Sequence, residues 1–349
     1  IDASGPNGEA GAISAVSAPT AGAGASGTIE VKGTDRFGNP VEGANLTVST
    51  NESLGGLVTG AKATTDDAGV ARFDFIETAA GTYDVTLTDE GGSVTQTVTV
   101  TVTSHPDGVS GGDGGSISVS GPTDTSAGQE ESFAVDATDV YGNPVAGEDV
   151  SVTVLEGVTV TNETLTTDAS GVATFTVVGE TVGDYEVVFS DASGGFTDTA
   201  SLSVAPDSQG LIAAGSSVAA VTPPEAAAGE SGEIALAVTD RFGNLLAGEE
   251  VVIAATDDLG GLTQGSAATA NDSGVATFGF SETTAGTYSV ELAAEYDPDL
   301  YISNQDARGT VSVTVTSAST GVGDGGRLEI DTTAVHYDEG RIPVTARDE

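Results

Sequence analysis

The chain has no cysteine, methionine or tryptophan among its 349 residues. Without cysteine there is no disulfide framework, no thiolate nucleophile and no cysteine-ligated zinc site. No run of about 18 or more apolar residues occurs, so this segment is not expected to span a membrane as a helix. Since position 1 is not methionine and no signal peptide is visible, we expect the chain to start after processing or to belong to something longer.

Basic residues are also scarce. The sequence has nine Lys and Arg against 53 Asp and Glu, which gives a formal net charge of −44. Such a surface repels phosphate backbones and anionic lipid, so neither nucleic-acid binding nor polybasic membrane attachment is expected. The acidic composition with only two lysines, Lys32 and Lys62, is typical of proteins from salt-loving organisms, because salt screens the self-repulsion. Disorder is the alternative for so charged a chain, but the apolar residues alternate as in strands and mean hydropathy is near zero.

Three phrases recur in the same order along the chain. The first is TDRFGNP at 34–40, TDVYGNP at 138–144 and TDRFGNL at 239–245. The second is TTDDAGVARFDF, TTDASGVATFTV and TANDSGVATFGF, and the third is Gly-x-Tyr at Tyr83, Tyr185 and Tyr288. Repetition at a period of about a hundred residues predicts a tandem array of domains.

The repeats set the expected domain boundaries. Within the first unit, short runs rich in Val, Thr, Ile, Phe and Tyr predict strands at 12–17, 27–33, 45–50, 61–65, 70–76, 82–88 and 94–103. Seven strands with regular turns and no helical period predict an all-β chain of immunoglobulin-like β-sandwich domains in an elongated array. The expected division is a leader or the end of a preceding segment at 1–10, domains at 11–104, 116–205 and 217–317, linkers at 105–115, 206–216 and 318–326, and the first strands of a truncated fourth unit at 327–349.

The first phrase predicts a turn between the second and third strands. Its glycine can take positive φ, its asparagine tolerates unusual backbone angles, and its proline fixes its own φ and pushes the asparagine before it toward extended geometry. The aromatic residue of each copy is expected to plug the end of its own sandwich rather than to bind a ligand, and each Gly-x-Tyr tyrosine is expected to form a tyrosine corner. The residues concerned are Gly38, Gly142 and Gly243; Phe37, Tyr141 and Phe242; and Tyr83, Tyr185 and Tyr288.

The phrases D-x-x-G-N-P, T-D-x-x-G-V-A-x-F and A-G-x-Y resemble the group 1 bacterial immunoglobulin-like domain of invasin and intimin stalks. The resemblance covers three units and the start of a fourth, and it departs at Leu245 and in the longer loop at 293–309. It implies an extracellular array of sandwiches that serves as stalk, lattice or adhesin. The acidic, lysine-poor composition additionally resembles haloarchaeal cell-surface proteins, such as S-layer glycoproteins built from immunoglobulin-like domains.

No set of residues predicts a catalytic site, and we expect neither an enzyme nor a cofactor. His105 and His336 lie in different units, no G-x-S-x-G elbow is present, and the carboxylates are spread over every unit. One loop could bind Ca²⁺ through oxygen ligands, although its spacing is not that of an EF-hand and an acidic surface loop is the favoured interpretation. The candidate ligands are Asp297, Asp299, Asn304 and Asp306.

Four N-x-S/T sequons are candidate glycosylation sites, at Asn45, Asn51, Asn162 and Asn271. The last three lie in loop-like surroundings, whereas Asn45 opens an expected strand.

Three functions stay open. The first is a structural array outside the cell, part of an S-layer or stalk, whose partners are other copies of itself in a lattice or filament. The second is an adhesin or filament subunit that binds surface glycans or other surface proteins, through the loop of Tyr296 and Tyr301 or by strand addition at the terminal strands. The third is a non-catalytic spacer of a larger secreted enzyme.

Overall fold

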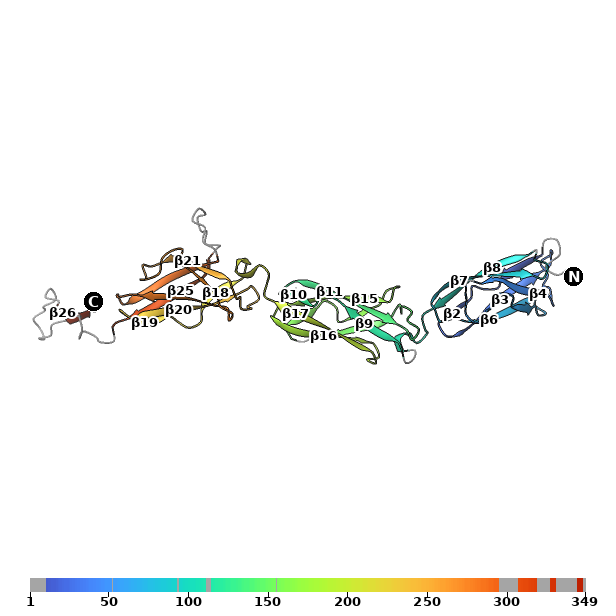
Figure 1. The fold of residues 1–349 in the computed structure, drawn as a ribbon, viewed down its shortest axis with the longest axis horizontal. Coiled ribbons are helices and arrows are strands. Elements are labelled where there is room, and N and C mark those ends of the chain that lie inside the picture. Colours follow the sequence, from blue (N-terminus) through green and yellow to red (C-terminus); the bar gives the residue numbers. More distant parts are fainter. Residues whose placement is uncertain are drawn as a thin grey trace, which may run out of the picture.

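Three β-sandwiches follow one another end to end in the computed structural model (Figure 1). The structure describes residues 11–51, 53–92, 94–110, 114–154, 156–294, 307–318, 327–330 and 344–347. Within these residues the regular structure is β-strand, apart from two short 3₁₀ turns. The expected fold class, tandem immunoglobulin-like sandwiches, is confirmed.

Unit 1 is a sandwich of a three-stranded sheet, in the order β1-β3-β6, and a five-stranded sheet, in the order β2-β8-β7-β4-β5. All its strand pairs are antiparallel except β2 with β8. Its strands are β1 (Ala12–Ala15), β2 (Thr20–Gly22), β3 (Ser26–Thr34), β4 (Asn45–Asn51), β5 (Lys62–Thr64), β6 (Val70–Ile76), β7 (Gly81–Asp89) and β8 (Thr95–Thr103).

Unit 2 has the same plan with one strand more. Its sheets run β13-β15-β11-β9 and β10-β17-β16-β12-β14. Its elements are η2 (Gly108–Ser110), β9 (Ser116–Ser120), β10 (Asp124–Ser126), β11 (Glu130–Thr138), β12 (Asp149–Thr153), β13 (Val158–Val160), β14 (Thr164–Thr166), β15 (Val172–Gly179), β16 (Gly183–Asp191) and β17 (Thr197–Ala205).

Unit 3 returns to the plan of unit 1, with sheets β18-β20-β23 and β19-β25-β24-β21-β22. Its elements are η3 (Gly210–Ile212), β18 (Ser217–Ala220), β19 (Glu225–Ala227), β20 (Ser231–Thr239), β21 (Glu250–Thr256), β22 (Ala267–Thr269), β23 (Val275–Ser281), β24 (Gly286–Ala293) and β25 (Ala307–Thr316). Beyond it, β26 (Arg327–Ile330) and β27 (Val344–Arg347) form an antiparallel pair.

The strand cores follow from the alternation in the sequence. In β6, Ala71, Phe73 and Phe75 are buried between the sheets, while the residues between them face outward. In unit 2 the ring of Phe189 packs against Phe133 and Phe175, at centroid separations of 6.0 and 5.3 Å. Each unit has a hydrophobic cluster of its own, so each has the core of an independent domain.

The short strand β2 was not expected from the sequence. Its three residues pair in parallel with β8, with Thr20 opposite Thr101. A three-residue segment beside Gly and Ala gives no period to detect, and only its pairing with the far end of the unit makes it a strand.

The segments expected to be linkers pack partly into the unit that follows them. Val109 in η2 is fully buried in the cluster of unit 2, and Leu211 in η3 is fully buried in that of unit 3. Within the first expected linker, residues 111–113 lie outside the described part of the chain. Each following unit is therefore held to the end of its connecting segment.

Candidate functional site: the junctions between units

The first repeated phrase forms a tight loop built on its aspartate. In unit 2, Asp139 is fully buried, and its Oδ1 accepts hydrogen bonds from the backbone N–H groups of Tyr141 and Asn143, both at 2.9 Å. Its Oδ2 accepts one from the side-chain Nδ2 of Asn143 at 2.8 Å. Gly142 has φ of 82°, a backbone angle that glycine adopts without strain. We call this loop, residues 35–39, 139–143 and 240–244 in the three units, the connector loop.

The connector loop of unit 2 also binds the chain that precedes it. The backbone N–H of His105, just after unit 1, donates to Oδ2 of Asp139 at 2.8 Å. The Nδ2 of Asn143 donates to the carbonyl of Thr78 at 2.8 Å, and its Oδ1 accepts from the N–H of Ala80 at 2.8 Å. Asn143 is therefore a two-way bridge into unit 1, and it is only 8% exposed.

The aromatic residue of the loop covers a glycine turn of the preceding unit. A methyl group added at Gly24 would overlap the ring of Tyr141, so this ring lies directly on the Ala23–Gly24 turn. We call this turn and the backbone groups of 78 and 80, with their equivalents at 127–128, 180 and 182, the acceptor end of a unit.

The expected role of the aromatic residues therefore differs from the observed one. They do not plug their own sandwiches: Tyr141 is 46% exposed and covers unit 1, and Phe242 packs against the core cluster of unit 2. Phe37, the equivalent residue of unit 1, is 68% exposed. The sequence places an aromatic residue at the end of each sandwich, but it gives no information on which side of that end the ring lies.

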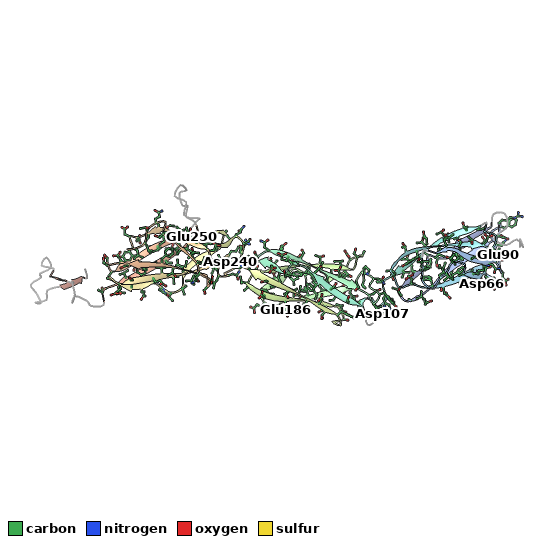
Figure 2. All side chains as sticks on the ribbon, in the orientation of Figure 1. Asp66, Glu90, Asp107, Glu186, Asp240 and Glu250 are labelled. Atoms are coloured by element: carbon green, nitrogen blue, oxygen red, sulfur yellow. The ribbon has the colours of Figure 1, made fainter. Side chains whose placement is uncertain are left out.

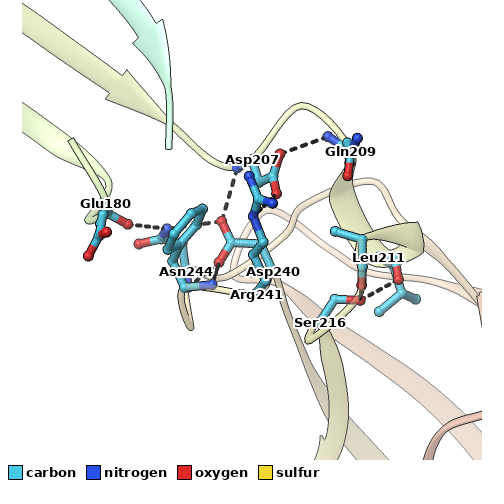
Figure 3. A network of polar contacts seen from close by, with 10 residues as sticks. Glu180, Asp207, Gln209, Leu211, Ser216, Asp240, Arg241 and Asn244 are labelled. Carbon is cyan, nitrogen blue, oxygen red and sulfur yellow. Dashed lines mark hydrogen bonds and ion pairs between the residues drawn. The ribbon is translucent and has the colours of Figure 1, made fainter. Parts of the chain in front are cut away.

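The second junction repeats these contacts with different neighbours (Figure 3). Asn244, 8% exposed, donates to the carbonyl of Glu180 at 2.8 Å and accepts from the N–H of Val182 at 2.9 Å. Asp240 accepts the N–H of Asp207 at 2.9 Å in addition to the N–H groups of its own loop. A methyl group added at Gly128 would overlap the Phe242 ring.

An ion pair distinguishes the second junction. The side chain of Asp207 is 1% exposed, and its Oδ2 lies 2.8 Å from Nε of Arg241, while its Oδ1 accepts the N–H of Gln209 at 3.1 Å. The guanidinium of Arg241 also stacks over the Phe242 ring, 4.8 Å from its centroid. In the first junction His105 occupies the place of Asp207, because its N–H donates to Asp139 as that of Asp207 donates to Asp240. The centroid of the His105 ring lies 6.2 Å from that of the Tyr141 ring.

The aspartates of the two connector loops that lie at junctions, Asp139 and Asp240, are held ionised. Burial alone would raise the pKa of Asp139 and of Asp240, because it disfavours the charged form. The hydrogen bonds from the loop asparagine and from backbone N–H groups outweigh burial, so both pKa values lie below the usual value for an aspartate. Each junction is thus built around a carboxylate that is saturated with donors.

The other residues singled out in the sequence have structural surroundings. The tyrosine hydroxyl groups each donate to the carbonyl four residues earlier, from Tyr83 to Ala79 at 2.8 Å and likewise in the other units. These bonds fix the backbone next to the acceptor end. Gly38 and Gly243 have φ of 84° and 88°. The loop asparagine, expected for its tolerance of unusual backbone angles, acts instead through its side chain, since the single described non-glycine residue with positive φ is Ser53.

The sequon asparagines lie in different settings. Asn162 is exposed between β13 and β14, and Asn51 is the last residue of β4. The Oδ1 of Asn271 accepts the N–H groups of Ser273 and Val275 in a tight turn. Asn45, at the start of β4, donates to Glu90 and accepts from Thr64.

The candidate Ca²⁺ ligands Asp297, Asp299, Asn304 and Asp306 lie outside the described residues, as do Tyr296, Tyr301 and His336. In the described part of the chain, no group of three or more His, Cys, Asp or Glu side chains is placed to hold a metal ion. Acidic side chains instead project from all three units, as Figure 2 shows for Glu90, Glu186 and Glu250. No described helix is long and apolar enough to cross a membrane.

The residues that join the units were not identified from the sequence. The signal was present, because Asn recurs four residues after Asp in every copy, whereas the turn itself needs only the glycine. The partner groups could not be found in this way, because they are backbone atoms of the preceding unit, and any residue supplies those.

The family described as "Bacterial Ig-like domain (group 1)" matches residues 13–103 and 122–205. Comparison with curated proteins gave no match. Among solved structures, the chain is similar to the Escherichia coli adhesin FdeC (TM-score 0.50, 19% identity, 88% of this chain and 97% of that one) and to Yersinia pseudotuberculosis InvD (TM-score 0.50, 16% identity, 88% and 96%). At this level of identity, these likenesses show the fold.

Proposed function

Because the chain belongs to the bacterial immunoglobulin-like domain (group 1) family, we propose that it is an extracellular structural protein, an array of sandwiches that spaces or tiles the cell surface as part of a surface layer or stalk. We propose no catalytic role for it. The single observation that supports this function is that both junctions hold the next unit through the same set of backbone-directed hydrogen bonds. An array fixed at every junction maintains distance, which a chain of freely jointed domains does not.

The proposal is tested on the native material. Antibodies against this segment should label the outside of intact cells, and electron micrographs of the purified protein should show rods, fibres or sheets. Labelling that appears only after the cells are broken, or flexible chains of beads with no preferred orientation, would contradict it.

We further propose that the protein works at high salt. The net charge of −44 leaves most carboxylates without a cation to pair with, since the sequence has 53 Asp and Glu against nine Lys and Arg. Repulsion among the remaining carboxylates falls as salt screens them. The melting temperature should therefore rise between dilute buffer and molar KCl; an unchanged or lower value would remove this part of the proposal.

Glycosylation of the surface belongs to the same proposal. Asn162 and Asn271 are the sequon residues with exposed side chains in loops or turns. The exposed Asn271 uses its Oδ1 for the turn, so its Nδ2, the atom that would carry a glycan, takes no part in these bonds. Peptide mass spectrometry of native protein should find hexose-containing adducts on these two residues; four unmodified sequons would contradict it.

An adhesin is the second candidate. FdeC, which shares the fold, is described as an adhesin. A purified chain that binds cells or surface glycans, with loss of binding when the loop at 295–306 is shortened, would favour this function over a purely structural one.

A further inference from the structure

Every unit has one pair of parallel strands, and this pair lies across the path of a pull along the array. The pairs are β2 with β8, β10 with β17, and β19 with β25. We propose that these clamp pairs, as we call them, let the array bear tension without unfolding. The inference rests on the proposed function and deepens it, because it names the load under which a surface stalk keeps its length.

In unit 2 the clamp pair joins the short strand β10 to the end of β17. Residues 124–126 lie opposite residues 203–205 in parallel register. Two backbone hydrogen bonds of 2.8 Å close the pair, one before it from the N–H of Ser203 to the carbonyl of Thr123, and one after it from the N–H of Ala127 to the carbonyl of Ala205. Within the pair, Val204 is 2% exposed and anchors it in the hydrophobic core.

Units 1 and 3 close their clamp pairs with the same two bonds. The donors and acceptors sit at corresponding positions, at distances between 2.8 and 3.0 Å, and the bonds run from Thr101 to Pro19, Ala23 to Thr103, Thr314 to Pro224 and Ala228 to Thr316. These residues differ in type from those of unit 2 at several positions, but the bonds join backbone atoms throughout. The clamp pair is therefore set by strand register and not by particular side chains.

A pull on unit 2 enters and leaves it at opposite ends, because units 1 and 3 lie on either side of it (Figure 1). The strand that precedes β10, β9, begins beside the connector loop, with Ser116 opposite Thr138. The last strand, β17, finishes at Ala205, which is bonded to the acceptor end at Ala127. Once β9 has slid off β11, tension draws β10 toward the connector loop and β17 toward the acceptor end.

This arrangement loads the clamp pair in shear. Parallel strands drawn in opposite directions along their length strain all their hydrogen bonds at the same time, whereas strands drawn apart from one end open bond by bond. Resistance to forced unfolding is set by the barrier to unfolding rather than by equilibrium stability. A pair of three residues per strand can therefore hold a whole unit, because it must break before the strands behind it feel the pull.

The direction of pulling gives a direct test, because the chain has no cysteine and accepts handles only where cysteines are introduced. Optical tweezers would pull the full chain between Thr123→Cys and Ala205→Cys, which shears the clamp pair of unit 2. The matched control moves the second handle to Ser201→Cys, also exposed on β17, so that the same two strands are peeled apart from one end. We expect the sheared chain to rupture at roughly twice the force of the peeled one, since its bonds break together.

A second test changes the clamp pair and keeps the direction of pulling. With a cysteine added at each end of the full chain, Thr125→Pro removes a backbone donor from the middle of β10. The control is Leu165→Pro in the middle of β14, a strand of equal length at the opposite edge of the same sheet. Thr125→Pro should shift one unfolding event to lower force. Leu165→Pro should leave the forces unchanged, even where it costs as much in urea unfolding.

Equal rupture forces for the sheared and the peeled chain would overturn the clamp, and this comparison does not depend on how well either proline variant folds. A force loss from Leu165→Pro as large as that from Thr125→Pro would overturn it as well. These outcomes are separate from the test of the proposed function. If the clamp fails while labelled cells and micrographs still show rods outside the cell, the spacing function stands without resistance to tension.

Discussion

The junction between units 1 and 2 and the junction between units 2 and 3 have one set of contacts in common and another set that differs. In both, the loop asparagine binds a carbonyl and an N–H group of the preceding unit, and the loop aspartate binds the N–H of the connecting segment. The side chains beside them differ, with His105 against Tyr141 in the first and Asp207 paired with Arg241 in the second.

The shared contacts are those that do not depend on the partner's side chains. Asn143 meets the backbone of Thr78 and Ala80, and Asn244 meets that of Glu180 and Val182, although these residues have little in common. A repeat protein that recognises backbone can join units of divergent sequence in one geometry. The side-chain pairs are then free to set the strength of each junction separately.

The largest effect is expected from replacing the loop aspartate, which is Asp139 in the first junction and Asp240 in the second. Asp240→Ala leaves the N–H groups of Phe242, Asn244 and Asp207 without their charged acceptor, so unit 3 should lose about 3 kcal/mol of unfolding free energy. Asp139→Ala should cost unit 2 a similar amount. Hydrogen exchange with mass spectrometry during urea unfolding resolves the units, and the exposed Asp136→Ala serves as the control. A cost no larger than that of the control would mean that the aspartate does not support the loop.

The ion pair should affect the second junction alone. Arg241→Val, which installs the residue type that Val140 supplies in the first junction, leaves the Asp207 carboxylate buried beside no cation. Since the Arg241 side chain is 37% exposed, we expect a cost of about 2 kcal/mol, less than for a broken pair in which both side chains are buried. Adding Asp207→Asn should restore part of it. Equal unfolding curves for the wild type and Arg241→Val would show that the ion pair contributes nothing.

The glycine turns separate docking from backbone strain. Gly128→Ala and Gly229→Ala impose the same positive φ on an alanine, which costs about 1 kcal/mol in each case. Only at Gly128 does the new methyl group also meet Phe242, so that variant should cost about 1 kcal/mol more and should loosen the second junction. Equal costs at the two positions, measured by urea unfolding, would contradict the docked position of the ring.

The smallest expected effect is the loss of stability that follows protonation of the loop aspartates, which leaves neutral pH unaffected. Because the pKa of Asp139 and of Asp240 is lowered in the folded chain, their contribution is complete above the ordinary aspartate value of about 4 and is lost as the pH falls through the lowered values. The protection of the Asn143 and Asn244 amides, taken as the intrinsic exchange rate divided by the observed rate, should therefore fall in acid. In Asp139→Asn and Asp240→Asn this protection should already be lower at neutral pH and should change less in acid; an equally steep acid response would assign the titration to other groups.

Much of the sandwich could be predicted from the sequence, because the alternation of apolar and polar residues along a strand indicates which of its faces is buried. The inward positions of β6 and the turn at Gly38 follow from residue type alone. The strand β2 could not be predicted, since its pairing lies about 80 residues away. The roles of Tyr141 and Asn143 could not be predicted either, because repetition marks residues needed by every unit without telling whether they serve their own unit or the previous one.

The central claim is that the connector loop fixes the orientation of one unit on the next. Spin labels on cysteines placed at exposed positions of units 1 and 2, in this otherwise cysteine-free chain, report the distance distribution across the first junction by electron–electron double resonance. We predict a narrow distribution for the wild type that becomes broad in Asn143→Ala, with each unit still folded. A broad distribution in the wild type, or one that Asn143→Ala leaves unchanged, would contradict the account.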